Sequence, residues 1–153
     1  MTLMIIASCS SIPEKTTADF KDITPKNGLY YIEDTLAQGE FTSYYENGVL
    51  RAKAEFKDGR YNGPFIANYE NGNKKLETSF KEGKVEGRYL VYYENGQLKT
   101  DENYKSGKLE GTTKEYYDTG ELESLINYRN DKPLGEASFY DREGNLLDKI
   151  YYE

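Results

Sequence analysis

The chain has 153 residues, with 20 lysines and arginines against 27 aspartates and glutamates, and so a formal net charge of −7. A chain of this charge is repelled by phosphate backbones and anionic lipid headgroups, which argues against a nucleic-acid partner. It contains no histidine and one cysteine, which excludes imidazole general bases, Ser-His or Cys-His nucleophiles, histidine metal ligands and an internal disulfide.

The first apolar segment, Leu3 to Cys9, ends in small residues directly before the single cysteine. It resembles a bacterial lipobox, whose cysteine is acylated and becomes the new N-terminus. The resemblance implies a signal over residues 1–9, lipidation at Cys9 and a lipid-anchored protein of the bacterial cell envelope. No lysine or arginine precedes Cys9, in contrast to an ordinary secretory signal. The alternative is therefore a chance apolar start and a cytoplasmic protein.

Residues 10–27 are polar, and we interpret them as a flexible tether between the membrane and the domain. Residues 28–38 contain the apolar run Leu29 to Ile32. We expect these residues to form a degenerate leading strand or hairpin.

From Gly39 onward the sequence repeats every 24 residues without a gap. One glycine column holds Gly39, Gly63, Gly87, Gly111 and Gly135, and a second holds Gly48, Gly72, Gly96, Gly120 and Gly144. Such self-similarity is the signature of a repeat architecture. We divide the region 39–153 into five repeats, with bounds 39–62, 63–86, 87–110, 111–134 and 135–153.

Each repeat carries a turn signal at the second glycine column, in the form Tyr-Glu-Asn-Gly in the first three copies. Asn-Gly between alternating apolar residues predicts a hairpin with a two-residue type I′ loop. In the first repeat this loop would pair Tyr45 with Leu50, Ser43 with Ala52 and Phe41 with Ala54. Gly48, Gly72, Gly96, Gly120 and Gly144 are thus predicted as structural turn residues.

A further turn near the end of each repeat contains Gly59, Gly83 or Gly107, and Asp131 replaces the glycine in the fourth copy. We expect longer hairpin loops here, with Asp131 accepting the positive φ that the glycines adopt. The register set by the first turns separates apolar from polar side chains. The sequence therefore predicts an all-β protein, an extended, twisted, single-layer antiparallel meander of about ten strands built from five hairpin repeats.

The segments Tyr92 to Lys99 and Tyr104 to Gly111 resemble the MORN repeat, and most of all the variant of bacterial proteins described as YwqK-type antitoxins. The resemblance covers Gly39 to Glu153. It implies an extended sheet whose aromatic-lined face often binds protein partners, with lipid binding sometimes proposed. Two positions depart from the pattern: Lys74 replaces a leucine and Asp141 replaces an aromatic residue.

The aromatic columns are the candidate binding site. The predicted partner-binding residues are Phe41, Tyr45, Phe65, Tyr69, Tyr89, Tyr93 and Tyr117. Stacked rings with hydroxyl groups suit a groove for a peptide, a glycan or an amphipathic helix, whereas the structural alternative is a cross-strand ladder that only stabilises the sheet. The turn carboxylates lack the pattern of a calcium loop, so we expect no metal site. We likewise expect no cofactor and no enzymatic activity, because a repeat supplies one kind of group many times.

The sequence thus predicts a non-enzymatic scaffold that binds a protein or peptide partner on the aromatic face, and membrane contact through an acyl group at Cys9. One alternative is an antitoxin-type binder of a neighbouring toxin. Another is edge-to-edge self-association through unpaired edges at Gly28 to Gln38 and Ile150 to Glu153. A cell-wall-binding repeat is a further alternative, although the chain has no tryptophan for the aromatic cages of choline-binding repeats.

Overall fold

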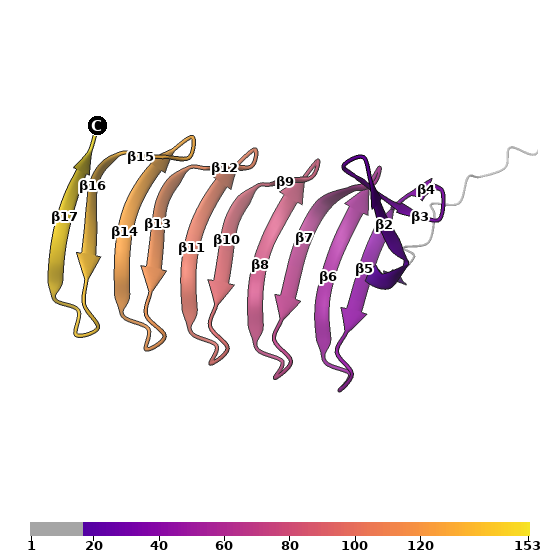
Figure 1. Ribbon diagram of the computed structural model, residues 1–153, viewed down its shortest axis with the longest axis horizontal. Helices are drawn as coiled ribbons and strands as arrows, with labels where there is room; N and C mark the ends of the chain where they lie inside the picture. The colour runs from indigo at the N-terminus through magenta and orange to yellow at the C-terminus, as the bar shows by residue number, and fades with distance from the viewer. Residues whose placement is uncertain (1–16) are drawn as a thin grey trace, which may run out of the picture.

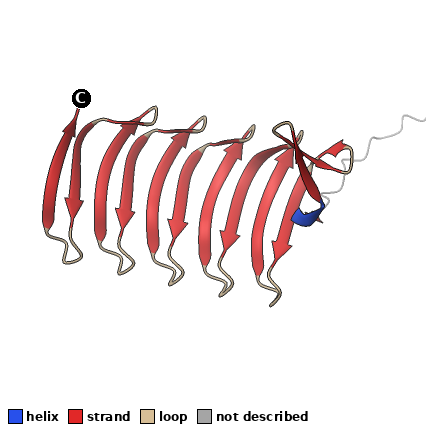
Figure 2. Cartoon of the chain, in the orientation of Figure 1, coloured by secondary structure: helices blue, strands red, loops and turns tan. Residues whose placement is uncertain are grey.

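The computed structural model describes residues 17–153, and these form an elongated row of hairpins (Figure 1). The predicted signal and Cys9 lie outside the described residues. A 14-stranded sheet runs in the order β1-β5-β6-β7-β8-β10-β11-β13-β14-β16-β17, with three short strands beside this path. The prediction of an all-β antiparallel meander is confirmed, while the strand number exceeds the predicted ten because short strands are added. Among the described residues the one helical segment is the three-residue η1 (Phe20–Asp22), and no helix could span a membrane (Figure 2).

Five long hairpins form the body of the sheet. They are β5 (Gly39–Tyr44) with β6 (Leu50–Lys57), β7 (Arg60–Asn68) with β8 (Lys74–Lys81), β10 (Gly87–Tyr92) with β11 (Leu98–Lys105), β13 (Gly111–Tyr116) with β14 (Leu122–Arg129), and β16 (Gly135–Tyr140) with β17 (Leu146–Tyr152). Two-residue strands precede the last three hairpins: β9 (Lys84–Val85), β12 (Lys108–Leu109) and β15 (Lys132–Pro133). The 24-residue period therefore corresponds to one long hairpin per repeat.

The turn at the second glycine column is a three-residue loop, and the prediction of a two-residue type I′ loop is wrong. The Tyr45 N–H donates to Val49 O at 2.8 Å, and the Gly48 N–H donates to Tyr45 O at 2.9 Å. Gly48 alone in this loop has a positive φ, +83°. The loop is thus a type I turn followed by a left-handed glycine.

The longer loop changes the register only next to the turn. Tyr44, rather than Tyr45, lies opposite Leu50, and the register shifts by one residue at this point. The predicted pairs of Ser43 with Ala52 and of Phe41 with Ala54 are confirmed. Beyond the bulge, the alternation of faces follows the sequence pattern.

The type I′ loops occur instead at the other end of each hairpin, where longer loops were expected. Both loop residues have positive φ in every copy: Asp58 and Gly59, Glu82 and Gly83, Ser106 and Gly107, Asn130 and Asp131. The strand residues on either side pair directly, Lys57 with Arg60 in the first copy. Asp131 has φ +66°, so its predicted role as a substitute for glycine is confirmed.

One face of the sheet, here called the aromatic face, carries an aromatic residue opposite each glycine of the first column. The pairs are Gly39 with Phe56, Gly63 with Phe80, Gly87 with Tyr104, Gly111 with Tyr128, and Gly135 with Tyr152. A glycine leaves its cross-strand position empty, and an aromatic ring on the partner strand can lie over it. This pairing explains both the first glycine column and the column of aromatic residues opposite it.

An unbroken row of paired residues shows which other side chains share this face. The row runs across the sheet through Ser43, Ala52, Ala67, Leu76, Val91, Thr100, Glu115, Ser124, Phe139 and Asp148. The alternate residues, among them Lys53, Ile66, Arg88 and Lys149, belong to the opposite face. Each face therefore contains the same positions of the 24-residue repeat from the first hairpin to the last.

An N-terminal cap covers one end of the aromatic face. It consists of β1 (Thr17–Asp19), η1, and a separate sheet of β2 (Ile23–Lys26), β3 (Leu29–Ile32) and β4 (Thr35–Leu36). The strand β1 pairs in parallel with β5 and so forms the first edge of the large sheet. The predicted tether is therefore wrong from Thr17 onward. The predicted hairpin at 28–38 exists as β3 and β4, but it lies in the cap and is not an edge of the large sheet.

The cap creates the hydrophobic core of the protein. Phe41 and Ala54 are completely buried and Phe56 is 3% exposed, together with Ala37 from the end of the cap. Phe20 and Tyr30 place their rings edge-on against Phe56, with centroids at 6.2 Å and 5.3 Å. Small side chains such as Ala137 are also buried elsewhere on the sheet, but the large buried side chains, Phe41 and Phe56, lie where the cap covers the sheet. The aromatic face is thus closed over the first hairpin.

Candidate functional site

The aromatic columns divide into two groups that lie in different places. Phe41, Phe65 and Tyr89 lie on the aromatic face, whereas Tyr45, Tyr69, Tyr93 and Tyr117 lie in the turns just beyond the ends of β5, β7, β10 and β13. The structure therefore does not bring all seven predicted partner-binding residues together. The three-residue loop is the cause, because it removes each turn tyrosine from its strand.

The turn tyrosines connect neighbouring repeats. Each hydroxyl donates a 2.8 Å hydrogen bond to a backbone carbonyl of the next hairpin: Tyr45 to Asn68, Tyr69 to Tyr92, Tyr93 to Tyr116 and Tyr117 to Tyr140. A basic side chain lies over each ring, with the Lys99 ammonium 5.4 Å from the Tyr93 centroid. The turn asparagines add parallel bonds, such as Asn71 Nδ2 to Glu94 O at 3.0 Å. These tyrosines have a structural role of the kind considered in the sequence analysis.

Replacing Tyr93 with phenylalanine should lower the free energy of unfolding by about 0.5–1.5 kcal/mol, because the Tyr116 carbonyl loses its donor. Tyr44→Phe is the control, since Tyr44 is 60% exposed and its hydroxyl forms no hydrogen bond within residues 17–153. Urea unfolding of both variants measures the difference. Equal stability of Tyr93→Phe and Tyr44→Phe would contradict a structural role for this hydroxyl.

Phe41 belongs to the core and offers no surface to a partner, since it is completely buried. Phe65 is partly buried and lines a hollow beside η1, together with Phe20 and Tyr61. Tyr89 lies farther along the face, with its ring 5.6 Å from that of Tyr104. The accessible part of the aromatic face therefore begins at the border of the cap and extends toward β17.

The predicted partner-binding residues left out the aromatic column that continues through all five repeats: Phe56, Phe80, Tyr104, Tyr128 and Tyr152. The signal was present as an unbroken 24-residue spacing. The prediction instead followed columns near the first turns, one of which changes to Thr113 and Ala137 in the last repeats. Outside the cap, Tyr104 and Tyr128 are the members of this column at the centre of the uncovered face.

Burial raises the pKa of the Tyr104 phenol to about 12, and its hydroxyl donates to Glu102 Oε2 at 3.0 Å. Partial burial also raises the pKa of the Glu102 carboxyl above its ordinary value, although the Tyr104 hydrogen bond opposes this shift. Farther along the face, burial raises the pKa of Tyr128. The uncovered face thus combines aromatic rings with partly desolvated polar groups.

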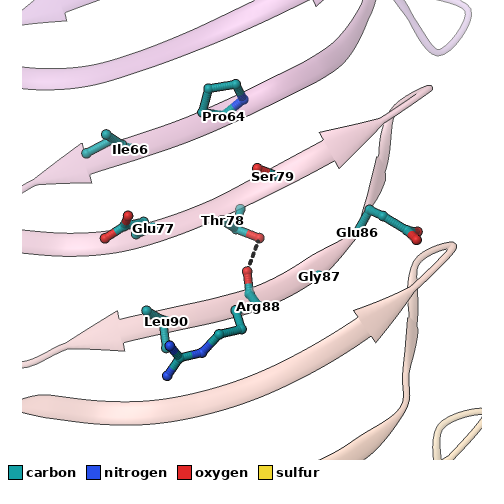
Figure 3. A pocket seen from close by; sticks show the side chains of 9 residues that line it. All are labelled: Pro64, Ile66, Glu77, Thr78, Ser79, Glu86, Gly87, Arg88 and Leu90. Atoms are coloured by element: carbon teal, nitrogen blue, oxygen red, sulfur yellow. Dashed lines mark hydrogen bonds between the residues drawn. The ribbon is translucent and has the colours of Figure 1, made fainter.

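The opposite face has a hollow of about 390 Å³ between β7, β8 and β10 (Figure 3). It forms where β8 and β10 separate, and the Thr78 hydroxyl crosses the gap to Arg88 O at 2.9 Å. Its charged side chains are all in structural interactions: Glu77 with Lys74 at 2.7 Å, Arg88 with Asp101 at 2.7 Å, and Glu86 Oε2 with Ser106 N at 2.6 Å. The charged side chains of the hollow therefore connect strands and turns of the sheet.

The two departures from the repeat pattern do not interrupt the sheet. Lys74 begins β8 and forms its ion pair on the protein surface. Asp141 replaces the turn tyrosine and accepts the Asn145 N–H at 2.7 Å, which closes the last turn locally. Within the described residues, no group of three or more histidine, cysteine, aspartate or glutamate side chains could hold a metal ion.

These features define a β-hairpin repeat protein with an aromatic face that no described segment covers beyond the cap. The model of the MORN repeat variant matches residues 37–58, 85–106, 109–130 and 133–153, which is more than half of the chain. The protein therefore belongs to the MORN repeat variant family. No curated protein matches the chain. The matched segments cover four of the five hairpins, and β7–β8 has the same structure.

MORN repeats are generally involved in protein or membrane binding, and the family is not a known class of enzyme. The β-hairpin repeat and the binding class inferred from the sequence are in accord with this membership. The particular partner, the lipid anchor and the envelope location stay predictions.

Proposed function

We propose that this protein is a non-enzymatic scaffold that binds a segment of a partner protein on the uncovered aromatic face, from Phe65 and Tyr89 to Tyr128. The observation that supports the proposal most strongly is the contrast between the two ends of this face. The cap buries Phe41 and Phe56, whereas no described segment covers Tyr89, Tyr104 and Tyr128. A surface lined by rings with polar tips suits a protein partner, because tyrosine combines large contact area with a hydrogen-bonding group.

Photo-crosslinking tests this proposal with a matched control on the adjacent residues. A benzophenone side chain at position 104 or 128 lies on the aromatic face, whereas at position 103 or 127 it lies on the opposite face. Asn103 and Asn127 are exposed, so the substitutions should be tolerated. In cells that express the full chain, we expect adducts from 104 and 128 but not from 103 and 127. Equal adducts from both faces, or none, would contradict the proposal.

The mass of the adduct also separates the specific candidates. An adduct with the product of a neighbouring gene would support the antitoxin-type role that the sequence resemblance suggests. An adduct of twice the chain mass would instead indicate self-association. The observation that favours self-association is the outer strand β17, where Leu147 is 64% and Tyr151 76% exposed.

Acylation of Cys9 would place the same binding face at a bacterial membrane, and intact mass of the native protein tests that proposal separately.

A further inference from the structure

Beyond the hollow beside η1, which Arg51 also lines, the charged residues that the strand register places on the aromatic face are all acidic. Glu102 on β11, Glu115 on β13 and Asp148 on β17 lie on this face, as the register of the sheet shows. The paired basic residues of this region lie on the opposite face: Arg88 on β10, Lys105 on β11, Lys114 on β13 and Lys149 on β17. The net charge of −7 does not by itself place acidic and basic side chains on different faces of the sheet. Acidic and basic residues are neighbours in the sequence, so their alternation along the strands produces the separation.

The three carboxylates have no cationic partner among the residues that the structure describes. Glu102 accepts from the Tyr104 hydroxyl, and Glu115 Oε2 accepts from the Ser124 hydroxyl at 3.0 Å. On the opposite face the carboxylates are paired: Asp101 with Arg88 at 2.7 Å, Glu136 with Lys149 at 2.6 Å, and Glu40 with Lys53 at 2.9 Å. These three carboxylates of the opposite face thus have cationic partners, whereas Glu102, Glu115 and Asp148 on the aromatic face have none within the described residues.

The polar side chain of Thr113 lies beside Glu102 and has an unused hydrogen-bonding atom. Thr113 is 5% exposed, and within the described residues its Oγ1 is the buried side-chain oxygen without a hydrogen bond. The pairs of Thr100 with Glu115 and of Asp101 with Lys114 continue in register to place Glu102 opposite Thr113. A buried hydroxyl without a hydrogen bond is costly, since native proteins satisfy most buried polar atoms. A donor that approaches Glu102 from the aromatic face would meet this second acceptor.

The three carboxylates are too far apart to bind a single metal ion together. Their spacing suits several lysine or arginine side chains of one peptide segment. No three acidic side chains converge as metal ligands in the described residues. Glu115 and Asp148 are three strands apart in the sheet order, a distance of about 14 Å at the usual strand spacing. The rings of Tyr89 and Tyr104 lie in the same region and can accept lysine or arginine groups on their faces. Anionic lipid headgroups would be repelled by the same carboxylates.

We infer that the partner segment bound by the aromatic face is basic, with lysine or arginine side chains that pair with Glu102, Glu115 and Asp148 while its apolar groups pack on the tyrosine rings. This inference rests on the proposed function, because it assigns the chemistry of the partner at the same face. The charge separation between the two faces is the feature that carries it.

The test uses peptides of random sequence selected by display for binding to the full chain, followed by fluorescence anisotropy with the selected synthetic peptides. We expect the selected sequences to be enriched in lysine and arginine. The double variant Glu102→Gln with Glu115→Gln should weaken their binding at least tenfold. The control Glu70→Gln with Glu94→Gln changes the net charge equally but lies at exposed turns, so it should have little effect. Equal weakening by both pairs would show nonspecific attraction and overturn the inference.

The Glu102→Gln variant is expected to remain folded. Burial raises the pKa of this carboxyl, so the folded state favours its protonated form. The stability that this form contributes is present below the ordinary pKa of 4.5 and is lost as pH rises through the folded pKa, where the carboxyl ionises while partly buried. Glutamine removes the cost of this ionisation, since its side chain is uncharged and still accepts the Tyr104 hydrogen bond. Its Tm should therefore exceed that of the wild type at pH 7, and this difference should disappear below pH 4.

The two proposals fail differently. Adducts from position 104 with a partner that lacks a basic contact segment, or selected peptides that are neutral or acidic, would overturn the inference and leave the binding function intact. Absence of adducts from position 104 would contradict the function itself. Cosedimentation of the full chain with phosphatidylserine vesicles, abolished by Tyr104→Ser, would also overturn the inference, because the face would then bind a membrane.

Discussion

Replacing Phe41 with alanine should lower the free energy of unfolding by about 3–5 kcal/mol, the range for a large aromatic side chain in a core. Phe41 is the largest fully buried side chain among the described residues, and its ring contacts Phe20 and Phe56 at centroid distances of 6.3 Å and 5.1 Å. The variant leaves a cavity between the cap and the sheet. Urea unfolding, followed by circular dichroism, gives the loss of stability.

Phe139→Ala is the matched control, because Phe139 lies on the same face but only partly buried and far from the cap. Its loss should cost clearly less than that of Phe41. In addition, the Phe41→Ala variant should become sensitive to proteolysis between residues 17 and 38, where the cap loses its main contact. A stability loss equal to that of Phe139→Ala would contradict the central place of Phe41 in the core.

The sequence alone predicted the architecture because the repeat supplies the same information five times. The 24-residue glycine columns indicated hairpins, and strand alternation then assigned Phe41, Phe65 and Tyr89 to one face. Both cues are local, and local patterns determine strand register well. The turn types were exchanged, however, because the Asn-Gly signal does not include contacts between repeats. The Asn47 amide donates to Glu70 O in the next hairpin, and the three-residue loop makes this contact possible.

The site could be predicted only in part, for a different physical reason. The cap covers the first hairpin through contacts between residues distant in sequence, such as Tyr30 with Tyr61 at 5.2 Å. No periodic signal in the polar residues 17–28 indicates these contacts. The prediction therefore treated Phe41 as exposed and these residues as a tether. Tyr89 lies outside the cap, and the sequence-based assignment of this residue to the accessible face agrees with the structure.

The cap border also explains why two glycines at equivalent turn positions should respond differently to substitution. We expect Gly59→Ala to cost substantially more stability than Gly83→Ala. Both residues have positive φ, +69° and +80°, so each alanine pays a similar conformational cost of about 1 kcal/mol. A methyl group at position 59 would in addition lie 2.8 Å from Tyr30 O and 2.7 Å from Leu36 Cδ2. At position 83 its nearest neighbour would be Arg60 Cβ at 3.8 Å.

The additional loss in Gly59→Ala should come from the cap, because the clash involves a backbone atom that cannot rotate away. Gly59 is also held to the cap by two backbone hydrogen bonds, from the Tyr30 N–H at 2.8 Å and to Ala37 O at 3.0 Å. Hydrogen exchange should therefore show faster exchange of the Tyr30 and Gly59 amides in Gly59→Ala, with the hairpins from β10 onward unchanged. Gly83→Ala should leave the Tyr30 amide as protected as in the wild type. If both variants lost the same stability and kept this protection, the cap would not be docked through the first type I′ turn.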